Sequence, residues 1–158
     1  MKHTISVLVE NKSGVLARIA TLFAARGYNI DSLAVGETDD PTISRMTIVV
    51  NGDEKILEQV EKQLNKLIDV IKLNDFLNIE HIERDLVLIK VKADKNTRNE
   101  ILQIVDIFRA KIIDVSVNTV IIEMTGDEDK IQAILNMLKP FGIKEVARTG
   151  IIAIARGA

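Results

Sequence analysis

The stretch from Glu10 to Ala20 combines residue types and spacing that suit the binding of a small anion. Asn11 and Ser13 are residue types that hydrogen-bond their own backbone in turns and cap helices. Gly14 lacks a Cβ atom, so a ligand could approach the amide groups of a following helix closely. Those amide groups, together with the helix dipole, favour a carboxylate. We therefore expect this corner to bind a free amino acid through its carboxylate.

The residues on either side predict the two elements that would position this corner. Before it, the apolar residues Ile5, Val7 and Val9 alternate along the chain, which is typical of a largely buried strand. After it, apolar residues recur at the i, i+3, i+4 and i+7 spacing of one helix face, at Leu16, Ile19, Ala20 and Phe23. The expected unit is a strand, a tight turn and a helix.

The rest of the chain offers few groups for catalysis. Its two histidines, His3 and His81, are expected to be solvent-exposed, one at the start of the chain and one in a linker. The pair Asp39 and Asp40 precedes Pro41 and is interpreted as a turn. There is no cysteine and no recognised nucleophile, metal or phosphate-binding motif. The sequence does not predict an enzyme, and we expect no cofactor or metal in this chain.

The composition argues against several classes of binding partner. The 158 residues are 47% hydrophobic and carry a net charge of −2, which does not favour nucleic acid or an anionic membrane. Aromatic residues make up only 3% of the chain, whereas a β-sheet that binds nucleic acid normally stacks the bases on aromatic side chains. No apolar run approaches the length of about 20 residues needed to span a bilayer. The beginning of the chain has no signal-peptide form, so we expect a cytoplasmic protein.

The order of predicted elements is β-α-β-β-α-β, and it occurs twice. In the first half the strands are expected at residues 5–10, 28–35, 43–50 and 70–76. The first helix follows Gly14, and the second follows Asp53 with an apolar stripe that includes Ile56, Leu57, Val60, Leu64, Leu67 and Ile68. In the second half the strands are expected at residues 85–93, 112–117, 120–125 and 143–155, the last bent at Gly150. Its helices follow Asn96 or Thr97 and Asp127.

A short sequence repeat supports this duplication. Gly52-Asp53-Glu54 recurs as Gly126-Asp127-Glu128, and each copy precedes a predicted helix. The predicted fold is therefore α+β, with two ferredoxin-like modules in tandem at residues 1–77 and 78–158. Modules this small bury a modest share of their surface, and their sheets have open edges. We expect at least a homodimer.

Five segments resemble the regulatory (small) subunit of bacterial acetohydroxyacid synthase, also called acetolactate synthase. They are Ser6–Leu16, Arg26–Leu33, Thr38–Thr47, Phe108–Val115 and Glu145–Gly150. The resemblance extends over essentially the whole chain and is most specific in the first 75 residues. It implies that the first module is an ACT domain, the version of this fold that senses amino acids.

The resemblance implies a function. A small subunit of this family does no chemistry, but binds and activates the large catalytic subunit and confers feedback inhibition by valine. Thiamine diphosphate, Mg²⁺ and FAD are then expected on the catalytic subunit. In the family, valine lies between the ACT domains of two protomers. The matching positions are Asn11, Gly14, Val15 and Leu16 from one protomer, and Asn29 and Ile30 from the other.

Several alternatives stay open at this point. Asn11 and Gly14 could serve only the turn, and Asn29 could simply follow the glycine that ends a helix. The second module has Asp94–Arg98 where the first has its Asn-x-x-Gly corner, so we expect it to serve dimerisation or docking and not valine binding. The whole chain could also be a stand-alone ACT-type amino-acid sensor or a transcriptional regulator.

Overall fold

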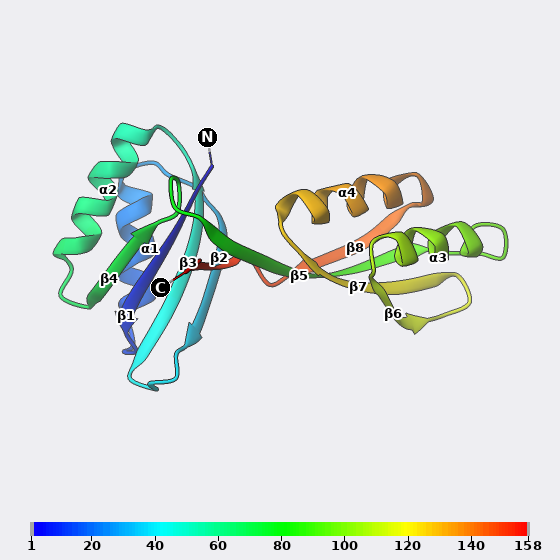
Figure 1. Cartoon of the computed structure of the whole chain (residues 1–158), viewed down its shortest axis with the longest axis horizontal. Coiled ribbons are helices and arrows are strands. Elements are labelled where there is room, and N and C mark those ends of the chain that lie inside the picture. Colours follow the sequence, from blue (N-terminus) through cyan, green and yellow to red (C-terminus); the bar gives the residue numbers. More distant parts are fainter. Residues whose placement is uncertain (1, 158) are drawn as a thin grey trace. The chain divides into compact units, whose positions relative to one another are not determined.

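The computed structural model describes residues 2–157 and contains two α+β units (Figure 1). The first unit comprises the chain up to Ile82 together with the segment from Ile151 onward, and the second is Glu83–Gly150. In each unit two helices cover one face of an antiparallel sheet (Figure 1). The predicted pair of ferredoxin-like modules is therefore confirmed.

The sheet of the first unit has the strand order β2-β3-β1-β4, so β2 and β4 are its edges. Its core is formed by alternate residues of the two central strands, Ile5, Val7 and Val9 of β1 and Met46, Ile48 and Val50 of β3. The elements are β1 (Lys2–Glu10), α1 (Val15–Ala25), β2 (Ile30–Glu37), β3 (Ile43–Asn51), α2 (Glu54–Lys66) and β4 (Val70–Asp75).

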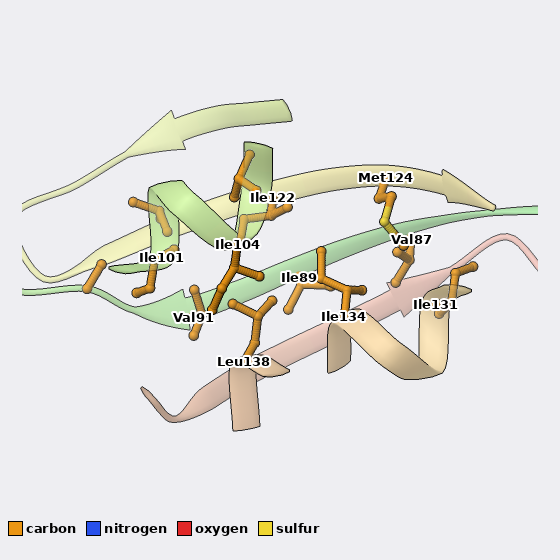
Figure 2. Close-up of a cluster of buried hydrophobic side chains, with 13 residues drawn as sticks. Val87, Ile89, Val91, Ile101, Ile104, Ile122, Met124, Ile131, Ile134 and Leu138 are labelled. Carbon is orange, nitrogen blue, oxygen red and sulfur yellow. The ribbon is translucent and has the colours of Figure 1, made fainter. Parts of the chain in front are cut away.

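The second unit repeats this plan with the strand order β6-β7-β5-β8. Figure 2 shows its core, in which Val87, Ile89 and Val91 of β5 face isoleucines of the two helices and Leu138. The elements are β5 (His81–Lys92), α3 (Arg98–Ile107), β6 (Lys111–Val115), β7 (Thr119–Gly126), α4 (Glu128–Leu138), a 3-10 turn (Lys139–Phe141) and β8 (Ile143–Arg148).

The repeated Gly-Asp-Glu sequence starts the second helix of each unit. The Asp53 carboxylate accepts a hydrogen bond from the Lys55 amide at 2.8 Å, and the Asp127 carboxylate accepts one from the Lys130 amide at 2.9 Å. Both aspartates are N-caps. The helix α3 begins differently from the prediction, because Thr97 makes no side-chain cap and the Asp94 carboxylate accepts from the Thr97 amide instead.

The end of the chain differs most from the prediction. The single last strand expected over residues 143–155 is two strands, β8 and β9 (Ile152–Ala155), separated by a turn in which Gly150 has φ +90°. The segment after this turn belongs to the first unit, where Ile151 and Ala153 are buried and the Ile151 amide donates to Ser32 Oγ at 3.0 Å. The structural division of the chain therefore differs from the predicted boundary between residues 77 and 78.

Three other predictions were wrong. His3 is buried and not solvent-exposed, because β1 extends to Lys2 and directs His3 inward in alternation with Ile5. Neither ring nitrogen of His3 has a hydrogen-bond partner among the described residues. Ile68 is 93% exposed because α2 ends at Lys66. His81 is not in a linker as predicted but is the first residue of β5, and its ring lies 4.8 Å from that of Phe76.

One carboxyl group in the first unit gives a pH-dependent prediction. Partial burial on α2, together with the neighbouring Asp75 and Glu58, raises the pKa of Glu61 to about 8. A carboxyl group whose pKa is higher in the folded state stabilises the fold fully at low pH, below its unfolded pKa of about 4.3. That contribution is lost as the pH rises toward 8.

Glu61→Gln should therefore flatten the pH dependence of unfolding, since glutamine stays neutral throughout. We expect the melting temperature of the wild-type chain to fall more between pH 5 and pH 8.5 than that of the variant, measured by circular dichroism. Glu54→Gln on the exposed surface of α2 is the control. An equal fall in wild type and Glu61→Gln would show that Glu61 titrates normally.

Candidate functional site

The corner between β1 and α1 opens on Gly14, which is the N-cap residue of α1. Its φ of +87° lies in the left-handed region that favours glycine. No side chain caps this helix, so the predicted capping by Asn11 or Ser13 does not occur. The first amide groups of a helix have no intrahelical acceptor. The Val15 amide donates to the Lys12 carbonyl at 3.5 Å, so the next amides of α1 are the donors that can bind a carboxylate.

Asn11 is held in place by the turn between β2 and β3. Its Nδ2 donates to the Pro41 carbonyl at 2.9 Å and lies 3.3 Å from Glu37 Oε1, and its backbone amide donates to the Thr42 carbonyl at 2.8 Å. These contacts use Nδ2 and the backbone amide of Asn11, and no hydrogen bond among the described residues uses its Oδ1. Asn11 thus serves the turn, which was the alternative interpretation of this residue. Its Oδ1 can still accept a hydrogen bond from a ligand.

An arginine beside Gly14 was missed by the sequence analysis. A Cβ atom placed on Gly14 would lie 3.2 Å from Arg18 Nη1, so this guanidinium lies next to the exposed helix start. Arg18 is four residues after Gly14, a spacing that places both on one side of a helix. That spacing is the feature of the sequence from which Arg18 could have been predicted as a site residue. The arginine places hydrogen-bond donors beside the helix start, at the point where a carboxylate is expected.

The position of Arg18 is fixed by the carboxylate of Asp69, in the turn between α2 and β4. Arg18 Nε and Nη2 lie 2.9 Å and 2.7 Å from the same oxygen, Oδ2 of Asp69. Asp69 is buried, and its backbone carbonyl accepts from the Glu10 amide at 2.9 Å. The side chain of Arg18 is half exposed, so it can still contact a ligand.

The two apolar residues predicted at this corner have different environments. Val15 is only 3% exposed and packs in the core of the first unit, so its side chain does not face a ligand at the surface. Leu16 is 45% exposed at the start of α1. Of this pair, Leu16 is the one that can provide an apolar contact.

Asn29 and Ile30 lie at the other end of β2 from this corner. Ile30 is the first residue of β2, and Glu37, its last, is near Asn11. Eight residues of strand span about 26 Å. Asn29 Nδ2 lies 3.4 Å from Asp31 Oδ1, and Ile30 packs partly against the first core. One chain therefore does not bring Asn29 and Ile30 together with Asn11 and Gly14.

The described part of the chain has neither a cluster of metal-binding side chains nor a membrane-spanning helix. Within residues 2–157 there is no group of three or more His, Asp or Glu side chains that could hold a metal ion. No helix in the same range is long and apolar enough to cross a membrane. The pair Asp39 and Asp40 lies in a turn as predicted, where Thr42 donates to the Asp40 carboxylate and lowers the pKa of Asp40.

Comparison with protein families matches each part of the chain separately. Residues 5–72 match the model described as the AHAS small subunit-like ACT domain. Residues 84–157 match the model described as the small subunit of acetolactate synthase. Together these matches cover both structural units.

Full-length relatives agree with the two family models. A probable acetolactate synthase small subunit from Archaeoglobus fulgidus is 57% identical, over 99% of this chain and 98% of the relative. The acetolactate synthase small subunit of Aquifex aeolicus is also 57% identical, over 98% of this chain and 81% of the relative. A crystal structure of the small subunit from Thermotoga maritima has a TM-score of 0.89 and 47% identity, covering 100% of this chain and 99% of that one.

Proposed function

The chain belongs to the family of acetolactate synthase small subunits, and from this premise we propose that it is a non-catalytic regulatory subunit. It would bind and activate the large catalytic subunit of the synthase in the cytoplasm and confer feedback inhibition by valine on branched-chain amino-acid biosynthesis. Thiamine diphosphate, Mg²⁺ and FAD would be held by the catalytic subunit. The observation that carries the regulatory part of this proposal is the uncapped start of α1 at Gly14, flanked by Arg18.

The geometry of β2 supports a valine site shared by two copies of the chain. The strand is an edge of its sheet and is free to pair with another strand. In an antiparallel pair of β2 strands, the start of one lies beside the end of the other. Since the end of β2 is next to Asn11, the second copy would bring its Asn29 and Ile30 to the corner that holds Asn11 and Gly14.

Each part of valine has a suitable group at such a site. The carboxylate would accept hydrogen bonds from the first amides of α1 and from Arg18. The ammonium would donate to the side-chain oxygen of Asn11 or Asn29. The isopropyl group would pack against Leu16 of one copy and Ile30 of the other. A ligand held by two chains changes the stability of their dimer, which couples valine to quaternary structure.

Reconstitution with the catalytic subunit tests this proposal. Adding the purified chain to the large subunit of the synthase should raise acetolactate production, and valine should then lower it. A chain that binds valine but neither binds nor affects the synthase would instead be a stand-alone sensor or transcriptional regulator. A chain that activates the synthase without responding to valine would refute the proposed effector site alone.

Asn29→Ala should weaken valine binding while leaving the fold intact. The substitution removes a polar partner of the ligand, for which we expect a loss of about 1–3 kcal/mol. Isothermal titration calorimetry measures the change, with Asn96→Ala, an exposed asparagine of the second unit, as the control. Unchanged valine affinity in Asn29→Ala would mean that Asn29 does not contact the ligand and is simply the residue that follows the end of α1.

A further inference from the structure

The outer strand of the second unit, β6, has the composition of a contact surface. It is the last strand of its sheet and has no neighbouring strand on its outer side within residues 2–157. Ile113 and Val115 are 50% and 59% exposed, and Val117 in the following turn is 83% exposed. The opposite edge, β8, has the sequence Ile-Lys-Glu-Val-Ala-Arg and is protected by charge. Of the two edges, β6 therefore has the more apolar exposed surface.

A β-bulge gives this edge an unusual arrangement of charge. Lys111 is opposite Glu123 on β7, and Asp114 is opposite Ile121, with a register shift between Ile112 and Asp114. Residues opposite Glu123 and Ile121 lie on one face of the sheet, because those two residues are separated by two positions. Lys111 and Asp114, which would lie on opposite faces of a regular strand, therefore share a face. A bulge commonly protects an edge, but here it also aligns two opposite charges.

This alignment makes the strand complementary to itself. If two copies of β6 pair antiparallel about a two-fold axis between Ile112 and Ile113, Lys111 of each copy lies directly opposite Asp114 of the other. Ile112 then lies opposite Ile113, and Val115 opposite Ala110. Opposite charges and apolar pairs both stabilise antiparallel neighbours. Neither Lys111 nor Asp114 has an ion-pair partner among the described residues.

We propose that β6 is a self-association edge that pairs antiparallel with β6 of a second copy, with Lys111 and Asp114 forming two symmetric ion pairs. The interface is isologous, since the same patch is used by both copies. It is separate from the β2 edge and so gives the second unit a role of its own in assembly. Five residues of strand make a small contact compared with the area of about 1,000 Å² of a stable interface. We therefore expect it to act together with other contacts between the same chains.

Cysteine cross-linking of the full chain tests this pairing. The natural sequence has no cysteine, so introduced thiols are unique. Chains with Lys111→Cys and with Asp114→Cys are oxidised separately and as a mixture. In the mixed pair the two thiols are directly opposite at a Cα distance of about 5 Å, within the range of a disulfide. The other Lys111–Asp114 ion pair is retained in this mixed pair.

The mixture should form a disulfide-linked dimer at least tenfold faster than either variant alone. A mixture of Lys144→Cys and Asp114→Cys is the matched control, because Lys144 is exposed on β8, the opposite edge strand of the same sheet. Equal rates in all mixtures, or no cross-linked dimer, would overturn the proposal. Since these thiols report only on β6, that outcome would leave the valine site at β2 untouched.

Discussion

Replacing Gly14 with aspartate is expected to abolish valine inhibition while the chain still activates the synthase. The new carboxylate would occupy the position proposed for the carboxylate of valine, at the start of α1 and beside Arg18. Two like charges about 4 Å apart repel by roughly 4 kcal/mol near a protein surface. This corresponds to a loss of more than 100-fold in affinity. Calorimetry with valine and a valine titration of the reconstituted synthase measure the effect.

The control for this variant is Gly14→Ala. Both substitutions place a Cβ atom 3.2 Å from Arg18 Nη1 and force an L-residue to adopt φ +87°, which costs about 1–2 kcal/mol. Only aspartate adds charge, and its attraction to the helix start offsets roughly 0.3–1 kcal/mol of that cost. Valine binding should therefore be weakened much less in Gly14→Ala. Normal valine binding by Gly14→Asp would place the site elsewhere.

Val35→Lys should separate two copies of the first unit and so weaken valine binding. Val35 is 50% exposed on β2, and lysine on an edge strand opposes pairing with another strand. Without the second copy, Asn29 and Ile30 no longer reach the corner at Gly14. We expect a smaller oligomer by analytical ultracentrifugation and a loss of at least tenfold in valine affinity, about 1.4 kcal/mol.

The matched control lies on the opposite edge of the same sheet. Ile71 on β4 is 51% exposed, so Ile71→Lys makes the same chemical change at the same exposure without affecting β2. It should leave both the oligomeric state and valine binding unchanged. If Ile71→Lys separates the copies and Val35→Lys does not, the dimer uses β4 and the shared site proposed at β2 is wrong.

The elements that the sequence predicted well are those specified by neighbouring residues. The alternation of Ile5, Val7 and Val9 predicts β1, and the apolar spacing from Leu16 to Phe23 predicts α1. Asp53 likewise caps α2 through an amide only two residues away. Such local patterns were enough to predict the order of helices and strands in both units, and hence the fold class.

The features that the sequence did not predict depend on distant parts of the chain. Arg18 is held by Asp69, 51 positions later, and no local pattern links them. The segment after Gly150 belongs to the first unit, where the Ile151 amide donates to Ser32 Oγ across 119 positions. The same limit applied to the candidate site, where the periodic pattern did not show that Val15 faces the core and Leu16 the surface. Local sequence also did not show that Gly14 adopts φ +87°, a left-handed conformation that favours glycine.

We propose that each valine site takes residues from two chains, and a mixed dimer tests this most directly. Chains carrying Gly14→Asp and chains carrying Asn29→Ala are given different tags, co-expressed and purified as the mixed dimer. One of its two sites then has both substitutions, while the other has native Gly14 from one chain and native Asn29 from the other. Calorimetry should find one valine bound per mixed dimer with wild-type affinity, although neither parent dimer has such a site. If the mixed dimer has no site of wild-type affinity, each site lies within one chain and the shared-site account is wrong.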